Sequence, residues 1–214
     1  MNLCIVSPFT VANVDQIINF IKGCGADLII FPGFNASNAL PVREVQNALQ
    51  THSKIFMEVP EEGLKAIKME VTPSIISKKD ILKMPKQIFA QKPTKSEIHA
   101  LLNIWDNRTL NLGNRKLTFI ICGEINGFNP DGHLKFDKEH IHDIIVNPCH
   151  TIMGHWNYLG PKLSNLSENS LTIHVTNNNK NNKNISTDLR IYENGQKVDK
   201  KKFTSNISWA YLDI

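Results

Sequence analysis

The chain has 214 residues, of which 41% are hydrophobic and 21% charged, and its formal net charge at pH 7 is +4. This composition is typical of an ordinary folded protein and excludes a disordered one. The longest apolar runs, such as DLIIFPGF, are far shorter than the roughly 20 residues that cross a bilayer, so we expect no membrane partner. The length fits a single domain that spans residues 1–214.

The positive charge is concentrated near the C-terminus. Residues 180–202 carry seven Lys or Arg against three Asp or Glu, which accounts for the whole excess of +4. We interpret this segment as a solvated loop and hairpin, and nucleic acid is not an expected partner. The start MNLCIVSPFT lacks the features of a signal peptide, and the four cysteines show no disulfide spacing. Both observations predict a cytoplasmic protein.

Apolar runs and turn residues predict alternating strands and helices. The expected strands are 2–7, 26–32, 53–59, 64–71, 116–122, 142–148, 171–177, 187–193 and 207–214. A helix that begins near Asn13 should stop at Gly23, Pro41 should open a second, and the sequence TKSE at 94–97 should cap a third. The sequence ENGQ predicts a hairpin turn. The asparagine-rich stretch 177–184 predicts a surface loop.

Three of the expected strands end in residues suited to a site. They are ADLIIFPG, which ends at Gly33, KLTFIICGE, which ends at Cys122 and Glu124, and DIIVNPCHT, which ends beyond Asn147. Ligand sites in α/β proteins gather beyond the carboxyl ends of strands. A cysteine at such an end can be held rigidly and still be accessible, although a free cysteine there is by default a small buried hydrophobe.

In this order and spacing, these three stretches resemble motifs of the nitrilase, or carbon–nitrogen hydrolase, superfamily. The resemblance implies an αββα sandwich of two packed mixed sheets with outer helices. It also implies a homo-oligomer that hydrolyses a small-molecule amide or nitrile without a cofactor or metal. In that chemistry a cysteine attacks the carbon, a glutamate shuttles protons and a lysine stabilises the developing negative charge. Cys122 falls on the nucleophile position.

The other two catalytic positions are less well matched. The family motif FPE appears here as Phe31-Pro32-Gly33, so the glutamate is absent. The stretch SKKDILKMP lies where the family has its lysine motif, which predicts Lys79 as the catalytic lysine, with Lys83 as the rival. Glu124 is the candidate for a substitute base, and the alternative is that its carboxylate accepts backbone N–H groups in a turn.

Further acids and a metal site have less support from the sequence. Glu58 and Glu61 are weaker candidates for the substitute base, and we interpret both as structural. Cys149 and His150 are sequence neighbours, whose side chains diverge in an extended chain, so we do not expect them to pair. We do not expect a zinc site from the available histidines and cysteine, which lack the usual ligand spacing: His133, His140, His142, Cys149, His150 and His155.

Two hypotheses about function follow. The first is an amide- or nitrile-directed hydrolase that uses Cys122, Lys79 and a displaced acid. The second is a degenerate member of the family that binds a small ligand or a protein partner in the old pocket without turnover. Gly33 is the residue that separates them, because glycine cannot move a proton.

Overall fold

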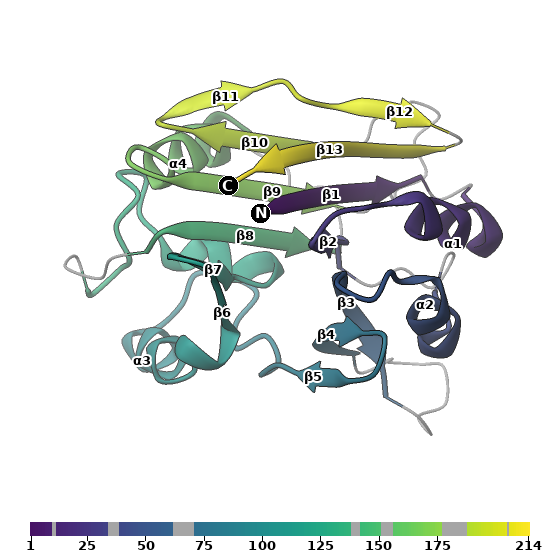
Figure 1. Cartoon of the computed structure of the whole chain (residues 1–214). Coiled ribbons are helices and arrows are strands. Elements are labelled where there is room, and N and C mark those ends of the chain that lie inside the picture. Colours follow the sequence, from purple (N-terminus) through teal and green to yellow (C-terminus); the bar gives the residue numbers. More distant parts are fainter. Residues whose placement is uncertain are drawn as a thin grey trace.

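Two β-sheets pack face to face, and helices cover their outer faces, as Figure 1 shows. The computed structural model describes residues 1–9, 12–33, 39–61, 71–137, 142–150, 156–176, 188–204 and 206–214. Within these ranges the first sheet has the strand order β12-β13-β1-β2-β3-β4-β5 and the second β11-β10-β9-β8-β7-β6. This is the predicted αββα sandwich.

The first sheet combines parallel and antiparallel neighbours. β1 pairs in parallel with β2, and β2 with β3, whereas β13 and β4 run antiparallel to their neighbours β1 and β3. Its strands are β1 (Asn2–Pro8), β2 (Leu28–Ile30), β3 (Lys54–Pro60), β4 (Val71–Ser77), β5 (Ile81–Lys83), β12 (Lys202–Thr204) and β13 (Ile207–Asp213).

The second sheet has the same mixed character. β7, β8 and β9 are parallel, and β6 and β10 flank them in antiparallel orientation. Its strands are β6 (Thr109–Leu112), β7 (Arg115–Phe119), β8 (Ile144–Cys149), β9 (Leu171–Thr176), β10 (Leu189–Glu193) and β11 (Gln196–Val198). The turn between β10 and β11 has positive φ angles at Asn194 and Gly195, which confirms the Asn-Gly hairpin.

Alternating side chains explain why both faces of each sheet are covered. In β1, Leu3 and Ile5 belong to the core between the sheets, while Cys4 and Val6 pack under the helices. Successive residues of a strand point to opposite faces, so an unbroken apolar run signals burial on both sides. Phe56 of the first sheet stacks on Phe119 of the second, with ring centroids 4.1 Å apart, at the centre of the sandwich.

The helices begin where the sequence supplies caps. α1 (Val14–Gly23) starts at Asn13, whose side chain accepts a hydrogen bond from the backbone of Gln16. α3 (Lys95–Asn103) starts at Thr94 with the expected capping box, and α2 (Val42–Ala48) follows Pro41. α1 and α2 cover the first sheet, and α3 and α4 (Trp156–Leu166) cover the second. Two short 3-10 helices, η2 (Asp106–Arg108) and η3 (Cys122–Gly127), adjoin β6 and β7.

One helix differs from the sequence prediction. The strand expected at 64–71 lies outside the described residues except for Val71, the first residue of β4. α4 was not predicted, because Gly160 and Pro161 inside it are signals that normally break a helix. The predicted loop 177–184 lies outside the described residues.

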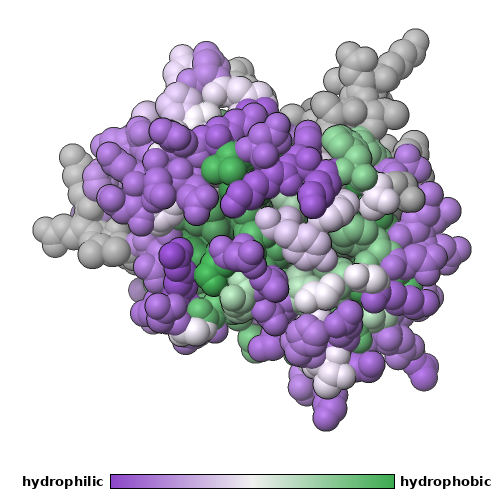
Figure 2. Space-filling model, turned by 45° about the horizontal axis from the view of Figure 1, so that its top comes forward, coloured by the Kyte–Doolittle hydropathy of each residue, from purple (hydrophilic) through white to green (hydrophobic). Residues whose placement is uncertain are grey.

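The surface mixes charged and apolar residues. Figure 2 shows one face, on which hydrophilic residues surround a band of apolar ones. The large apolar side chains that are exposed in the described part of the chain come from several elements and loops: Met1, Ile81, Leu82, Phe136, Tyr158, Phe203 and Tyr211. Across these same ranges, every helix is too short or too polar to cross a bilayer.

Candidate functional site

Cys122 lies at a sharp turn directly beyond the inner strand β7. The pairing of this part of the chain with β8 continues up to Ile120, whose N–H donates to the carbonyl of Val146 at 2.8 Å. Cys122 then adopts φ of +45°, a left-handed conformation that is uncommon for any residue with a Cβ. Such strain persists only where surrounding contacts enforce it. The Cys122 side chain is half-buried at this turn.

Asn147 of β8 holds this turn from the neighbouring strand. Its side-chain Nδ2 donates to the carbonyl of Ile120 at 2.6 Å and to the carbonyl of Cys122 at 3.0 Å. Its Oδ1 lies 2.7 Å from Nδ1 of His174 on β9 and 3.2 Å from the sulfur of Cys149. Burial lowers the pKa of His174 to about 3, so this imidazole is neutral and donates its Nδ1 proton to Asn147.

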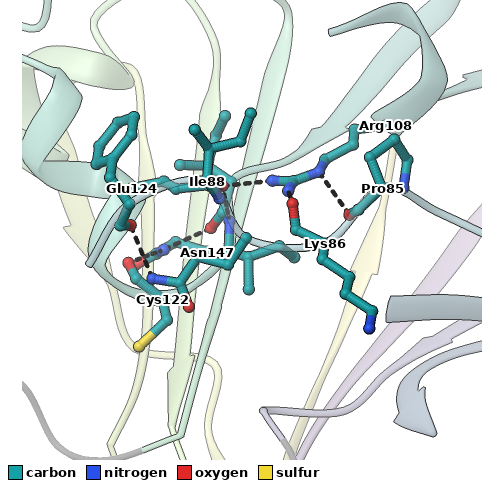
Figure 3. Close-up of polar contacts among 11 residues, drawn as sticks. Pro85, Lys86, Ile88, Arg108, Cys122, Glu124 and Asn147 are labelled. Carbon is teal, nitrogen blue, oxygen red and sulfur yellow. Dashed lines mark hydrogen bonds and ion pairs between the residues drawn. The ribbon is translucent and has the colours of Figure 1, made fainter. Parts of the chain in front are cut away.

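Glu124 braces the same turn from the other side. Its carboxylate accepts the backbone N–H of Ile121 at 2.8 Å and that of Ile88 at 2.6 Å, and it forms a buried ion pair with Arg108. Arg108 also donates to the carbonyls of Pro85 and Lys86. Burial raises the pKa of Glu124, and the Arg108 guanidinium opposes that rise. Figure 3 shows the Cys122 sulfur pointing away from this pair.

The geometry of Glu124 therefore matches the alternative that the sequence left open. Both carboxylate oxygens are occupied by donors that fix the backbone around Cys122, and the side chain is fully buried. A group held in this way positions the turn. A catalytic role for Glu124 stays a prediction.

The residue that faces Cys122 is His150, the first residue beyond β8. A hydrogen bond from the Cys149 side chain, followed by bonds from the side chain and backbone of His150, lowers the pKa of Cys122 to about 4. The Cys149 thiol has one proton to give, which either Asn147 Oδ1 or the Cys122 thiolate can accept. Nε2 of His150 lies 2.6 Å from Oε2 of Glu58. These contacts form a chain from the thiol through the imidazole to a carboxylate.

The charges in this chain stabilise one another. The hydrogen bonds to Cys122 and to Glu58 raise the pKa of His150 to about 10. Between about pH 4 and pH 10 the site therefore holds a thiolate and an imidazolium. Glu58 lies on the same face of β3 as Phe56, at the end of the core between the sheets, and its side chain is almost fully buried. A buried carboxylate that accepts from His150 fixes the orientation of the ring.

Gly33 occupies the position where the family motif has its glutamate. Its N–H donates to the carbonyl of Cys149 at 3.1 Å, which ties the end of β2 in one sheet to the end of β8 in the other. A Cβ at this position would lie 2.7 Å from the backbone nitrogen of His150 and 2.9 Å from its ring carbon Cδ2. His150 therefore fills the space that a side chain at residue 33 would need.

The predicted lysines lie on the hairpin between β4 and β5. Lys79 is exposed in the turn, where its N–H donates to Oγ of Ser77 at 3.3 Å, and Lys83 is exposed at the end of β5. The contacts of Cys122 described above come from residues of β8 and its end. A catalytic role for Lys79 stays a prediction. Lys86, whose carbonyl accepts from Arg108, lies on the segment that packs against η3, and its Nζ lies 2.8 Å from Glu61.

No group of three or more metal-ligating side chains comes together among the described residues. Of the candidates for a zinc site, His140 and His155 fall outside these residues. His142 instead places its Nε2 3.1 Å from the carbonyl of Leu166, and His150 is engaged with Cys122 and Glu58.

Sequence reasoning missed the contact of His150 with Cys122, and it interpreted Glu58, which contacts His150, as structural. It compared His150 only with its neighbour Cys149. The signal that could have found the pair was the rule already applied to Cys122: β7 and β8 are parallel, so residues just beyond them meet at one edge of the sheet. Arg108 carried no signal, because it lies on a short 3-10 helix outside the three motifs.

No protein-family model matches the chain, and no curated protein matches it by sequence. Solved structures match it throughout. A cysteine-to-serine mutant of the amidase from Nesterenkonia sp. AN1, of the nitrilase superfamily, has a TM-score of 0.64 and 11% identity, with 100% of this chain and 91% of that chain covered. The chain has a nitrilase-like fold.

Other solved structures have the same nitrilase-like fold. A glutamine-dependent NAD(+) synthetase from Cytophaga hutchinsonii has a TM-score of 0.57 and 12% identity over 100% of this chain. The chain spans only 43% of that protein. A further structure, a glutamate-to-glutamine mutant of the Nesterenkonia amidase, carries acrylamide added at its active-site cysteine and has a TM-score of 0.59 at 13% identity.

Proposed function

We propose that this protein hydrolyses carbon–nitrogen bonds of small amides, with Cys122 as nucleophile, His150 as general acid and base, and Glu58 as the residue that orients His150. The observation that carries the proposal is the imidazole held between the Glu58 carboxylate, at 2.6 Å, and the strained Cys122. This arrangement satisfies the two geometric requirements of an activated nucleophile, which are a base in contact with it and a third group that holds the base. The nitrilase-like fold adds support, since its solved examples include amidases.

In the first half of the proposed reaction, the Cys122 thiolate attacks the carbonyl carbon of the amide. The carbon–sulfur bond forms and the carbonyl electrons move to oxygen. As the carbonyl re-forms and the carbon–nitrogen bond breaks, the His150 imidazolium gives its proton to the departing nitrogen. Ammonia or an amine leaves, and a thioester on Cys122 remains.

In the second half, the neutral His150 takes a proton from water while the water oxygen attacks the thioester. The carbon–oxygen bond forms and the carbon–sulfur bond breaks. The carboxylic acid leaves, and the thiolate and imidazolium are restored. His150 and Glu58 thus supply the proton transfer for which Gly33 offers no group, and a charged nucleophile is present without a lysine.

Ammonia release from a panel of short aliphatic amides and nitriles tests the proposal. We expect turnover of amides by the unmodified protein, none by Cys122→Ser, and a loss of roughly 10²–10⁴-fold in His150→Gln, the usual contribution of a positioned acid and base. His99→Gln, at an exposed position on α3, is the matched control and should leave turnover unchanged. Full activity in His150→Gln would overturn the assignment of His150.

Acrylamide provides a second readout that does not depend on finding the right substrate. It adds to the active-site cysteine of the Nesterenkonia amidase, and we expect it to add to Cys122 here. A protein in which Cys122 reacts with acrylamide but no amide or nitrile is turned over would contradict the hydrolase and favour the ligand-binding alternative.

The assembly state and the cellular location also belong to this proposal. We expect a homo-oligomer, as the family resemblance implies, and a cytoplasmic location, as the start of the sequence and the cysteine spacing indicate. Sedimentation velocity at several protein concentrations tests the oligomer, and a single monomeric species at all concentrations would count against it.

A further inference from the structure

A second thiol, that of Cys149, lies close to Cys122. The amide of Asn147 holds both cysteines: its Nδ2 donates to the carbonyl of Cys122 at 3.0 Å, and its Oδ1 lies 3.2 Å from the sulfur of Cys149. The hydrogen bond between the two side chains lowers the pKa of Cys122 and contributes to the raised pKa of Cys149. Cys149 is fully buried at the end of β8, whereas Cys122 is half-buried at the site.

The proposed hydrolysis uses only the Cys122 thiol, so it assigns no chemical role to Cys149. Thiolates in accessible sites react with peroxides, and a nearby second thiol can trap the oxidised sulfur as a disulfide. We propose that Cys122 and Cys149 form a hydroperoxide-reactive pair, in which Cys122 is oxidised first and Cys149 then closes a disulfide. The proposal rests on the Cys122 thiolate of the proposed function but not on amide turnover.

The first step is a two-electron transfer. The Cys122 thiolate attacks one oxygen of the hydroperoxide, so a sulfur–oxygen bond forms and the oxygen–oxygen bond breaks. The departing oxygen takes the proton of the His150 imidazolium and leaves as water or an alcohol. Cys122 becomes a sulfenic acid, and the hydroperoxide is reduced.

The second step joins the two sulfurs. Cys149 attacks the sulfenic sulfur of Cys122, the sulfur–sulfur bond forms and the sulfur–oxygen bond breaks. The departing hydroxide combines with the proton of the Cys149 thiol as water. Two thiols and one hydroperoxide thus give one disulfide, one water and one alcohol or second water, and the disulfide blocks the nucleophile until a thiol reductant restores it.

The charges of Cys122 and Cys149 determine which of the two cysteines reacts first. Burial, followed by the hydrogen bond and charge of the Cys122 thiolate, raises the pKa of Cys149 well above its ordinary value. While Cys122 is a thiolate, Cys149 stays a neutral thiol. Oxidation of Cys122 to the sulfenic acid removes that negative charge, so Cys149 ionises more readily at the moment when it has a partner to attack.

The chain offers an internal control. Cys4 and Cys24 also contact each other, and Cys24 lies 3.2 Å from the hydroxyl of Tyr211. Both are buried, with exposed fractions of 0% and 2%, so a hydroperoxide cannot reach either sulfur. Because a hydroperoxide has no access to these two thiols, Cys4 and Cys24 should stay reduced under conditions that oxidise Cys122 and Cys149.

The test is titration of the reduced protein with hydrogen peroxide, followed by peptide mapping without reduction. We expect a peptide in which Cys122 is linked to Cys149, lower in mass by two hydrogens and reversed by dithiothreitol, before any change at Cys4 or Cys24. In Cys149→Ser the sulfenic acid at Cys122 should persist and react with dimedone. Cys24→Ser is the matched control and should still form the linked peptide.

Two outcomes would overturn the proposal. One is oxidation of Cys122 in the unmodified protein straight to sulfinic acid without a linked peptide. The other is oxidation of Cys4 and Cys24 at the same rate. Melting curves of each variant, together with iodoacetamide labelling of Cys122 before peroxide, show that the thiolate is intact. If labelling succeeds and the linked peptide forms while no amide is hydrolysed, only the proposed function fails.

Discussion

The backbone nitrogen of His150 lies 2.7 Å from the point where a Cβ on Gly33 would be. The space between these two residues therefore has room for the side chain of only one of them. In the family motif that the chain resembles, this place belongs to a glutamate on the strand end of the first sheet. Here the second sheet supplies a histidine to the same place. In the proposed function, the proton-transferring group therefore comes from the second sheet, and Gly33 leaves room for it.

Gly33→Ala should therefore destabilise the protein. The added methyl would meet the backbone of Cys149 and His150, which cannot move like a flexible side chain, and overpacking of this kind costs about 1–3 kcal/mol. Gly25→Ala is the matched control, because a Cβ there meets open space. Denaturant unfolding of both variants measures the difference, and equal stabilities would show that the strand ends can separate.

The larger substitution Gly33→Glu should not restore a nitrilase-type site. Removal of the imidazole in a Gly33→Glu, His150→Ala double variant would relieve the ring contact but leave the contacts of 2.7 and 2.8 Å with the backbone. We expect low stability and no gain in amide turnover in either variant. A folded double variant with turnover equal to the unmodified protein would contradict this.

The reactivity of Cys122 should be nearly independent of pH over a wide range. Its pKa is lowered from 9.0 to about 4, so the thiolate persists as pH falls and is lost only near pH 4. The pKa of His150 is raised from 6.5 to about 10, so the imidazolium is lost only as pH rises toward 10. Iodoacetamide labelling of Cys122 followed by mass spectrometry should be flat from about pH 5 to pH 9.

His150→Gln should shift this profile upward. Loss of the imidazolium removes a charge that favours the thiolate, so the pKa of Cys122 rises toward its ordinary value and labelling at pH 6 slows at least about tenfold. His99→Gln should label like the unmodified protein. A profile that is unchanged in His150→Gln would mean that Cys149 and the backbone alone hold the thiolate.

Glu58→Gln tests orientation separately from charge. The amide can still accept from His150 but carries no negative charge, so the pKa of His150 should fall and amide turnover should drop with it. We expect the high-pH limb of the turnover profile to move to lower pH, while Cys122 remains reactive to iodoacetamide. Glu193→Gln, at an exposed position on β10, is the control. If the high-pH limb of the turnover profile does not move in Glu58→Gln, Glu58 is only structural.

Glu124→Gln separates the two interpretations of that residue. If Glu124 braces the turn, loss of its charge leaves the buried guanidinium of Arg108 without its carboxylate counter-ion, which costs about 3–5 kcal/mol of unfolding free energy. If Glu124 is the catalytic base, turnover should vanish while the melting temperature stays unchanged. Calorimetry and ammonia release on the same sample decide between these results, and we expect the loss of stability.

Asn147→Ala should loosen the turn at Cys122. The substitution leaves the buried carbonyl of Ile120 without its side-chain donor and the imidazole of His174 without its acceptor, at about 1–3 kcal/mol for each group. The strained φ of Cys122 should then relax, with slower labelling by acrylamide. Asn111→Ala, at an exposed position on β6, is the control. Unchanged labelling at reduced stability would limit Asn147 to a packing role.

Much of the architecture could be predicted from the sequence, because its signals are local. The unbroken apolar run of β1, the capping box at Thr94 and the Asn-Gly turn at Asn194 each depend on residues within a few positions. The ordered strand ends carry the family resemblance, which predicted the αββα sandwich and Cys122 as the nucleophile. α4 escaped prediction because packing against the second sheet outweighs the helix-breaking tendency of its glycine and proline.

The partners of Cys122 were decided by tertiary structure alone. His150 lies 28 residues from Cys122 along the chain, and the two approach each other because β7 and β8 are parallel. Glu58 lies 64 residues from Cys122 and reaches His150 because the two sheets pack face to face. A hydrogen bond depends on distances of tenths of an ångström, which arise from the packing of both sheets and leave no local trace in the sequence. The sequence by itself determined which residue could be a nucleophile at a strand end, and the fold determined that an imidazole and a carboxylate converge on it.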